Sequence, residues 1–194
     1  HIRKPINPYG HSKLIVEDIL RNICTANNFN ATCLRYFNAA GAHPSGKIGE
    51  SRDPETHLIP NILKTALSNN DTLKVFGNNY PTPDGTCIRD YVHVTDLVDA
   101  HLLSLDYMKK NKGFSAFNLG NGIGFSVLEV INTCKEISNI DIKYKIDNKR
   151  EGDPPKLIAD IEKAKNILEW NPKDSKLNNI ISSAWKWHSS IRKY

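Results

Sequence analysis

The fold class is indicated by residues 7–37, which read NPYGHSKLIVEDILRNICTANNFNATCLRYF. Asn7-Pro8 is typical of a helix start, because proline fits the first helical turn. Apolar side chains then recur at helical spacing from Leu14 to Cys24, which predicts an amphipathic helix. Residues 31–37 have the composition of a buried strand. A helix that leads into a buried strand is the repeating unit of α/β proteins.

The rest of the chain continues this alternation. Further helices are expected at 58–67, 95–109, 126–137, from Asp160 to just before Trp170, and at about 176–192. Further strands are expected at 73–76, 91–94, 116–119 and 143–146. We expect Thr95 to cap the helix at 95–109, and Ser126 with Glu129 to form a capping box. The pattern predicts α/β architecture with some parallel strand pairing.

The composition is that of a globular protein. Of the 194 residues, 39% are hydrophobic and 24% charged, and the net charge is +5. No apolar run approaches the ~18 residues of a membrane-spanning helix, and the lysines are spread too evenly for a nucleic-acid surface. Integral membrane, collagen-like and disordered proteins are therefore excluded, and neither a membrane nor a nucleic acid is an expected partner. The seven histidines lack the spacing of metal ligands, so no metal site is expected.

Two further features concern the context of the chain. It begins with His1 and its single methionine is Met108, so we expect it to be a piece of a longer polypeptide. The cysteines are scattered and form no Cys-x-x-Cys pair, which indicates reduced, mostly buried thiols. They are Cys24, Cys33, Cys87 and Cys134.

The strongest local signal for chemistry is Tyr9-Gly10-His11-Ser12-Lys13. Tyr9 and Lys13 are four residues apart and share one face of the first predicted helix. Tyrosine is a poor base at neutral pH, but a neighbouring ammonium favours its ionised form. An exposed lysine is too weak for this alone, so burial and a second positive charge such as an oxidised nicotinamide would have to help. By itself the pair is also compatible with a purely structural role.

Three longer strings follow this pair along the chain. They are LRYFNAAGAH at 34–43, DGTCIRDYVHV at 84–94 and REGD at 150–153. In this order and at these spacings, the strings resemble the UDP-glucose 4-epimerase family of the extended short-chain dehydrogenase/reductases. The resemblance runs from about Pro5 to the C-terminal helix.

The resemblance implies part of a Rossmann-type parallel sheet plus a smaller C-terminal α/β substrate-binding domain. Residues 1–38 would be the C-terminal part of the NAD-binding Rossmann domain. Residues 39–194 would mainly bind the UDP-sugar, with segments near 89–110 returning to the Rossmann domain. The family's glycine-rich phosphate loop and its assisting serine or threonine are absent from this sequence, and the glycines at 120–124 lack the βαβ setting such a loop needs.

The implied activity is the interconversion of UDP-galactose and UDP-glucose with tightly bound NAD. A cytoplasmic homodimer acting in galactose metabolism is implied with it. Tyr9 would be the catalytic base and acid at the sugar C4 hydroxyl, and Lys13 would bind the nicotinamide ribose and tune Tyr9. A 4-keto sugar would rotate and be reduced on its other face. The 194-residue piece alone is expected to be inactive.

Other residues match family positions that bind the cofactor or the substrate. Tyr36 and Phe37 match the cofactor side, where Phe37 flanks the nicotinamide. Arg89 and Arg150 match arginines on the diphosphate, whose oxygens suit a guanidinium fork. The positions that match the substrate side are Asn38, His57, Leu58, Lys74, Phe76, Arg89, Arg150, Asp153 and Leu157.

Within that set, Asn38 matches a residue that hydrogen-bonds the UDP-sugar, and Asp153 one on the uridine ribose. Lys74 and Phe76 belong to the strand that contacts uracil. Without the resemblance, each of these residues would be given an ordinary role in a turn, a strand core or the surface.

Two positions depart from the family pattern. His57 replaces a polar amide near the diphosphate, where a histidine can donate the same hydrogen bond, and Leu58 would contribute only its backbone. Leu157 aligns with a gate to the sugar pocket where some members carry tyrosine. A smaller gate would admit a 2-acetamido group and hence N-acetylated UDP-hexosamines.

Two alternatives stay open. A nucleotide-sugar dehydratase or decarboxylase of the same superfamily shares the Tyr-x-x-x-Lys pair and usually adds acidic residues upstream of it. A non-catalytic fragment that binds UDP-sugars would use the same substrate residues without turnover.

Overall fold

The computed structural model describes residues 3–68 and 71–191. Its helices are α1 (Pro8–Ala26), α2 (Leu58–Leu67), α3 (Val94–Lys110), α4 (Val127–Ser138), α5 (Glu162–Leu168) and α6 (Leu177–Ser190). Its strands are β1 (Ala31–Tyr36), β2 (Asn38–Ala40), β3 (Leu73–Phe76), β4 (Ile88–His93), β5 (Phe114–Leu119), β6 (Gly124–Ser126), β7 (Tyr144–Asp147) and β8 (Lys156–Leu157).

These strands form three small sheets. β1 pairs in parallel with β5, and β3 pairs in parallel with β7. The third sheet is mixed: β4 lies between β2, which is parallel to it, and the antiparallel β6, and it also pairs in parallel with β8. The expected α/β architecture with parallel pairing is therefore confirmed.

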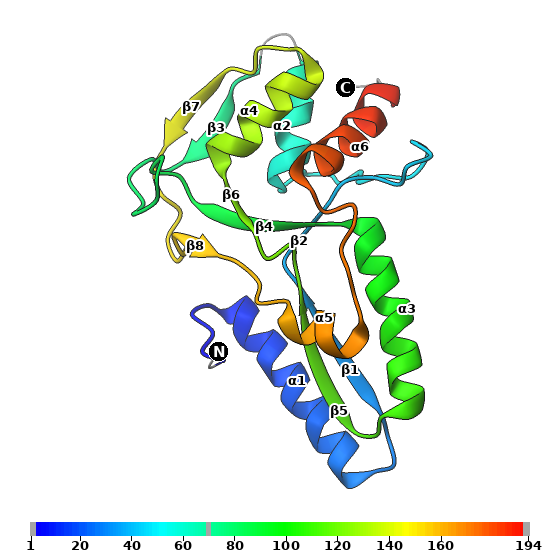
Figure 1. The fold of residues 1–194 in the computed structure, drawn as a ribbon. Coiled ribbons are helices and arrows are strands. Elements are labelled where there is room, and N and C mark those ends of the chain that lie inside the picture. Colours follow the sequence, from blue (N-terminus) through cyan, green and yellow to red (C-terminus); the bar gives the residue numbers. More distant parts are fainter. Residues whose placement is uncertain (1–2, 69–70, 192–194) are drawn as a thin grey trace.

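The elements gather into two lobes that Figure 1 shows one above the other. The lower lobe contains α1, β1, β5, α3 and α5, and the upper lobe contains α2, α4, α6, β3 and β7. β4 crosses between them, and Phe37 alone separates β1 in the lower lobe from β2 in the middle sheet. The chain thus passes from one lobe to the other at the carboxyl end of β1.

Each lobe has its own apolar core. The upper core is formed where α2, α4 and α6 pack together, with Ile62, Ile131 and Ile180 fully buried. The lower core surrounds Phe117 of β5 and Trp170, whose indole Nε1 donates to the carbonyl of Asp96 at 2.8 Å. Two cores indicate that the lobes are stabilised separately.

Side-chain caps begin three of the six described helices, α1, α3 and α4. Asn7 caps α1 by accepting from Gly10 N, and proline occupies the first turn as expected. The capping box of Ser126 and Glu129 is present at α4. The prediction for Thr95 is wrong. The cap of α3 is His93, whose ring accepts from Thr95 N, so the helix begins at Val94.

The other differences from the expected elements are small. The last helix ends at Ser190 rather than at about 192, a position outside the described residues, as are the outer ends of both expected domains. β2, β6 and β8 were not expected. Cys87 and Cys134 are buried and Cys24 and Cys33 half-buried, and all four are free thiols. No helix within the described ranges is long and apolar enough to cross a membrane.

Candidate functional site

Tyr9 and Lys13 lie together on the first turns of α1. The Lys13 Nζ is 5.2 Å from the centroid of the Tyr9 ring, so the two side chains share a face as expected. The Tyr9 residue is 73% exposed. Lys13 forms no ion pair with any carboxylate in residues 3–68 or 71–191, and its ammonium is therefore available to a ligand beside the ring.

Tyr36, Phe37 and Asn38 lie where β1 ends and β2 begins. Tyr36 is 52% exposed, and Phe37 N donates to the carbonyl of Leu119, which continues the pairing with β5. The side-chain amide of Asn38 donates from Nδ2 to the carbonyl of Asp90 at 2.7 Å. This crossover is at the carboxyl end of parallel strands, where α/β proteins bind ligands.

Arg89, Asp153 and Leu157 are brought together between β4 and β8. Arg89 aligns with Leu157 in the strand pairing, and its guanidinium donates to the carbonyl of Pro154 at 2.8 Å. The same guanidinium forms an ion pair with Asp153, with Nη2 3.5 Å from Oδ1. Arg89 is thereby held in place by three neighbours before any ligand arrives.

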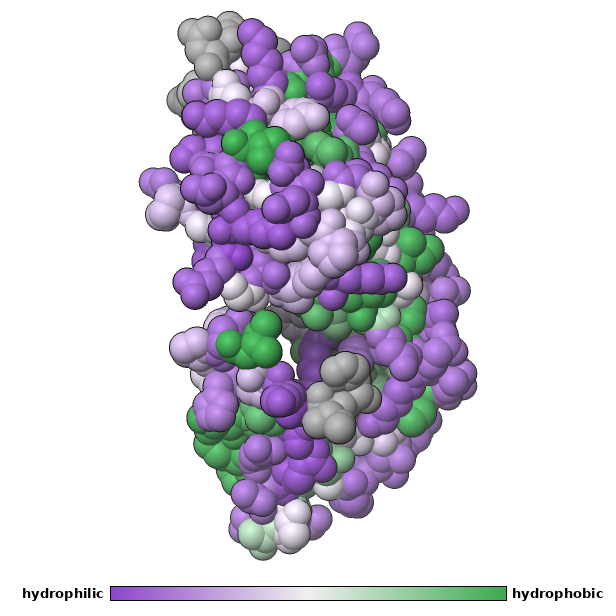
Figure 2. All heavy atoms as spheres, turned by 90° about the vertical axis from the view of Figure 1, so that its left-hand side faces the viewer, coloured by the Kyte–Doolittle hydropathy of each residue, from purple (hydrophilic) through white to green (hydrophobic). Residues whose placement is uncertain are grey.

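Arg150, Phe76 and Lys74 extend this group toward β3. The guanidinium carbon of Arg150 is 3.9 Å from the centroid of the Phe76 ring, which is a cation–π contact. A turn joins Arg150 to Asp153, whose N–H donates to the Arg150 carbonyl. Lys74 Nζ lies 3.3 Å from Asp147 Oδ2 on β7. Figure 2 shows this side of the molecule, which is largely hydrophilic and is hollowed between the lobes.

His57 and Leu58 lie at the start of α2, and both ring nitrogens of His57 are engaged. Nδ1 is 2.6 Å from Glu50 Oε1, and Nε2 is 3.2 Å from Arg52 Nη1. Because a guanidinium can only donate, Nε2 accepts and Nδ1 carries the proton donated to Glu50. A neutral His57 therefore has no proton left for a further acceptor.

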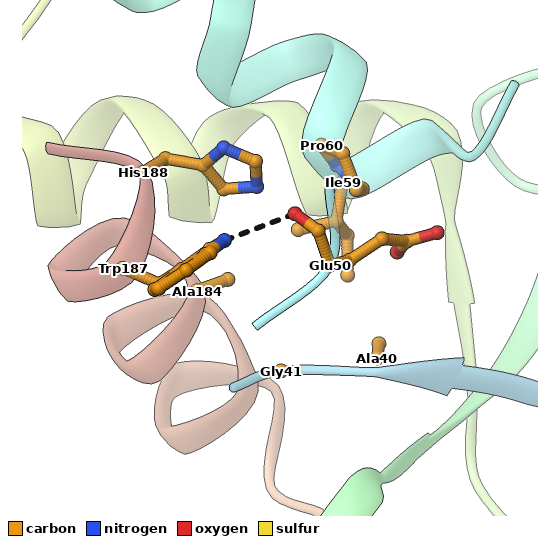
Figure 3. A pocket seen from close by; sticks show the side chains of 8 residues that line it. All are labelled: Ala40, Gly41, Glu50, Ile59, Pro60, Ala184, Trp187 and His188. Atoms are coloured by element: carbon orange, nitrogen blue, oxygen red, sulfur yellow. Dashed lines mark hydrogen bonds between the residues drawn. The ribbon is translucent and has the colours of Figure 1, made fainter. Parts of the chain in front are cut away.

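The backbone around Glu50 is held by α6. Trp187 Nε1 donates to the Glu50 carbonyl at 2.9 Å, while the Glu50 carboxylate points away from the indole (Figure 3). The cavity at this place measures about 10 Å³, room for about one water molecule. It is lined by Ala40, Gly41, Glu50, Ile59, Pro60, Ala184, Trp187 and His188. Burial lowers the pKa of the His188 imidazole there.

One group of potential metal ligands occurs within the described residues. The ligand atoms of Glu50, Glu55 and His57 lie within 4.8 Å of one another. However, Lys64 Nζ is 3.8 Å from Glu55 Oε2, and Arg52 donates to His57. A cation already compensates Glu55, and both ring nitrogens of His57 are engaged, so we assign no metal to this group.

A buried histidine joins the lobes without forming a nucleophilic site. His93 Nε2 is 2.9 Å from Ser183 Oγ, and His93 Nδ1 accepts from Thr95 N. Since the Ser183 hydroxyl donates its proton to the Ile180 carbonyl, the His93 ring is the donor in its contact with Ser183, which places a proton on Nε2. The serine is therefore not activated by this histidine, and burial lowers the pKa of the His93 imidazole.

A larger hollow of about 250 Å³ lies in the lower lobe. It is lined by Arg21, Arg35, Phe114, Ser115, Ala116, Asn118 and Lys163. Its cations have partners of their own: Arg35 pairs with Glu17, Lys163 Nζ donates to the Ala116 carbonyl, and Arg21 lies over the Phe114 ring. We therefore assign it no ligand.

The geometry thus forms one connected group from Phe76 through Arg150 and Asp153 to Arg89 and Leu157. The Tyr9–Lys13 pair and His57 are not linked to it by any hydrogen bond or ion pair among the described residues. Sequence reasoning missed Glu50 and Arg52, which fix His57, and Asp90, which accepts from three backbone N–H groups. Asp90 lies in the quoted string at 84–94, but its spacing alone does not reveal these partners.

Comparison with known proteins places these features in a family. The model of the NAD dependent epimerase/dehydratase family matches residues 1–120. The UDP-glucose 4-epimerase of Lactobacillus helveticus is 48% identical over 186 residues, which are 96% of this chain and 56% of that protein. The chain therefore spans about half the length of the curated relatives it matches.

Two solved structures share the fold. The UDP-glucose 4-epimerase of Brucella ovis in complex with NAD is 44% identical with a TM-score of 0.88, over 94% of this chain and 56% of that one. The enzyme of Bifidobacterium longum in complex with NAD+ and UDP is 38% identical with a TM-score of 0.90, over 95% and 55%. The Rossmann-like α/β fold agrees with the family match, and the chain belongs to the NAD dependent epimerase/dehydratase family.

Proposed function

We propose that this chain supplies the proton-transfer pair and the sugar-nucleotide lobe of an NAD-dependent UDP-glucose 4-epimerase, an isomerase that interconverts UDP-galactose and UDP-glucose. The observation that carries the proposal is the Tyr9–Lys13 pair on one face of α1, with an exposed ring and an ammonium that no described carboxylate neutralises. The relatives that match nearly the whole chain are named for this activity.

The residues of the lower lobe fit a nicotinamide cofactor. Bound NAD would supply the hydride acceptor and donor. Tyr9 would take the proton of the sugar C4 hydroxyl and return it, and the Lys13 ammonium would favour the ionised ring while binding ribose hydroxyls. Tyr36 and Phe37 lie where the strands end and would contact the cofactor from the sheet.

The group between β4, β8 and β3 fits a nucleoside diphosphate. Arg89 and Arg150 would bind the diphosphate, Phe76 and Lys74 the base, and Asp153 the ribose. Asn38 would contact the sugar, and Leu157 would line its pocket. His57 and Leu58 would approach the diphosphate from the start of α2, where Leu58 offers its N–H.

The domain division follows from this assignment. Residues 1–38 and the segments near 89–110 would belong to the cofactor-binding domain, and most of 39–194 to the substrate-binding domain. The two lobes have separate cores, which supports two domains, and the lower core also takes in Phe117 of β5 and Trp170 from within residues 39–194. A homodimer in the cytoplasm, acting in galactose metabolism, completes the proposal.

The test is an epimerase assay on the longest natural polypeptide that contains this chain, with UDP-galactose and UDP-N-acetylgalactosamine offered separately. Tyr9→Phe is expected to lower kcat at least about 100-fold, because it removes the group that moves the proton. The matched control is Tyr144→Phe, in which an exposed tyrosine of β7 loses the same hydroxyl. Conversion of both substrates would support a pocket left open by Leu157.

Two results would contradict the proposal. Equal activity of Tyr9→Phe and the control would remove Tyr9 from the chemistry. No conversion of either substrate by a protein that holds NAD would favour a nucleotide-sugar dehydratase or decarboxylase. The 194-residue chain alone is expected to bind no NAD and to be inactive, leaving at most the binding of UDP-sugars.

A further inference from the structure

Asp90 is a buried carboxylate that forms no ion pair with any cation in residues 3–68 or 71–191. It lies in β4 and is 0% exposed. Oδ1 accepts from Asn121 N at 2.6 Å, and Oδ2 accepts from Gly122 N and Ala159 N, both at 3.0 Å. Three backbone donors therefore stabilise the charge of a group that would otherwise be expensive to bury.

The three donors come from two separate segments. Asn121 and Gly122 follow β5, and Ala159 follows β8. A side chain at Gly120 would press its Cβ against Asp90 Oδ2 and come within 2.6 Å of the Ala159 Cβ, so a glycine is needed at this approach. Asp90 thereby joins β4, the end of β5 and the segment after β8 at one point.

Three of the proposed substrate residues depend on that point. Arg89 precedes Asp90 in β4, and its side chain points to the other face of the sheet. Leu157 aligns with Arg89 and lies two residues before Ala159. Asn38 donates its amide to the Asp90 carbonyl at 2.7 Å.

We propose that Asp90 is a positioning residue that fixes Leu157 relative to Arg89 and Asn38, and so sets the width of the sugar subsite. The inference rests on the proposed function, because it names the determinant of substrate selectivity at the same site. The strand β8 is only two residues long and is exposed, and the carboxylate bond to Ala159 N adds a buried anchor to its short pairing with β4. Releasing that anchor should widen the pocket on the Leu157 side.

The principal variant is Asp90→Asn, which keeps the shape but turns one acceptor into a donor that faces a backbone N–H. The KM for UDP-galactose is expected to rise about tenfold, with kcat changed less than about threefold, because one charged hydrogen bond is lost away from the reacting atoms. The ratio of kcat/KM for UDP-N-acetylgalactosamine over UDP-galactose should also rise.

The matched control is Asp96→Asn. Asp96 is another buried aspartate, which accepts from Lys173 N, Asp174 N and Ser175 Oγ, but its partners lie before α6 and not beside β8. It should lower stability as much as Asp90→Asn and leave KM and the substrate ratio unchanged. Equal kinetic effects in the two variants would overturn the inference, since they would reflect general destabilisation.

A second pair of variants tests the route through Leu157. Leu157 is 46% exposed, so Leu157→Ala should fold, and in its background Asp90→Asn should no longer change the substrate ratio. Ala159→Gly keeps the N–H and loosens the same segment, so it should shift KM in the same direction. If Asp90→Asn does not fold, Ala159→Gly serves as the test instead. An unchanged KM in Ala159→Gly would refute the proposal.

Amide hydrogen exchange separates this inference from the proposed function. In the unliganded protein, Asp90→Asn should speed exchange at residues 157–159 relative to Asp96→Asn. If Asp90→Asn speeds exchange at these residues but the wild-type protein turns over no UDP-sugar, the proposed function is refuted and the structural role of Asp90 is retained. Unchanged exchange in an active enzyme would refute that structural role and retain the function.

Discussion

α1 and α2 are both amphipathic helices, and they differ in how much of their apolar surface the described chain covers. α2 has ten residues, of which Ile59, Pro60, Ile62, Leu63 and Ala66 are buried against α4, α6 and β3. α1 has 19 residues, and its one buried residue is the charged Glu17. The isoleucines and valine of α1 lie exposed, although their spacing is as regular as that in α2. Periodicity predicts the helix but not whether the rest of the chain covers it.

The consequence is that the two helices are held by different forces. α2 depends on apolar packing, whereas α1 is tied to β1 by a charged contact, since the Glu17 carboxylate accepts two hydrogen bonds from the Arg35 guanidinium. The proposed catalytic pair therefore lies on the helix with less apolar support.

The largest change in stability should come from the buried face of α2. Ile62→Ala removes a fully buried side chain of α2 and is expected to lower the free energy of unfolding by about 2–5 kcal/mol. Ile19→Ala makes the same change on α1, where the residue is 51% exposed, and should cost less than about 0.5 kcal/mol. Urea unfolding of both variants measures the difference. Equal losses would show that the apolar face of α1 is buried in solution.

The charged tie of α1 should give the next largest effect. Glu17→Gln leaves Arg35 without its carboxylate and is expected to cost about 1–3 kcal/mol. The control is Asp18→Asn, whose exposed carboxylate pairs with Arg3 and with no other cation among the described residues, and which should change stability by less than about 0.5 kcal/mol. Unfolding midpoints compare the two neighbours directly.

The stabilisation by the Glu17–Arg35 contact should be lost in acid. The hydrogen bond from Arg35 lowers the pKa of Glu17 from its ordinary 4.5. Its contribution to stability is therefore complete above that value and is lost as pH falls through the lowered folded pKa. Urea unfolding at several pH values below 4.5 measures this loss of stability. If the free energy of unfolding falls as steeply with pH in Glu17→Gln as in the wild type, the acid sensitivity belongs to other carboxyl groups.

The junction of the lobes should respond in a different pH range. Burial lowers the pKa of His93 below its ordinary 6.5, so the unfolded chain binds a proton that the folded chain does not. Stability should fall as pH drops below about 6.5, by at most about 1.4 kcal/mol per pH unit for this group. His93→Gln should flatten that slope in urea titrations at pH 7.5 to 5.5. The buried His188 titrates in the same range and should account for what remains.

The smallest effect is expected at the solvent-facing end of α3. Lys109 pairs with Asp106 at 2.7 Å, but both side chains are exposed. Lys109→Ala should change the unfolding free energy by less than about 0.5 kcal/mol, because exposed ion pairs are screened and gain little. A cost close to that of Glu17→Gln would mean that burial is not what distinguishes the two ion pairs.

Much of the fold could be predicted because its signals are local. The bounds of α2 agree with the expected 58–67, and the capping box at Ser126 follows from residues three apart. β2, β6 and β8 could not be predicted, because each has two or three residues and exists only by pairing with the distant β4. Strands of that length have no periodicity of their own.

The candidate site divides in the same way. Tyr9 and Lys13 could be paired from their spacing, since a helix brings such positions together. The expectation that His57 offers a hydrogen bond to the diphosphate stays a prediction, and it requires the ring to exchange Glu50 or Arg52 for the ligand. These two partners could not be predicted, because they depend on the path of a long loop. The contacts of Asp90 are with the backbone N–H groups of residues 121, 122 and 159. They could not be predicted, because nearly every residue type carries such a group.

The strand pairing has a consequence for folding during synthesis. β1 aligns Ala31 with Phe114, β2 aligns Asn38 with Tyr91, and β3 aligns Leu73 with Tyr144. Each of these strands can therefore pair only after a partner far along the chain has been synthesised. Until then its backbone N–H and C=O groups along that edge remain unpaired. We expect slow refolding and a nascent chain that relies on chaperones from the emergence of β1 until β7 has left the exit tunnel.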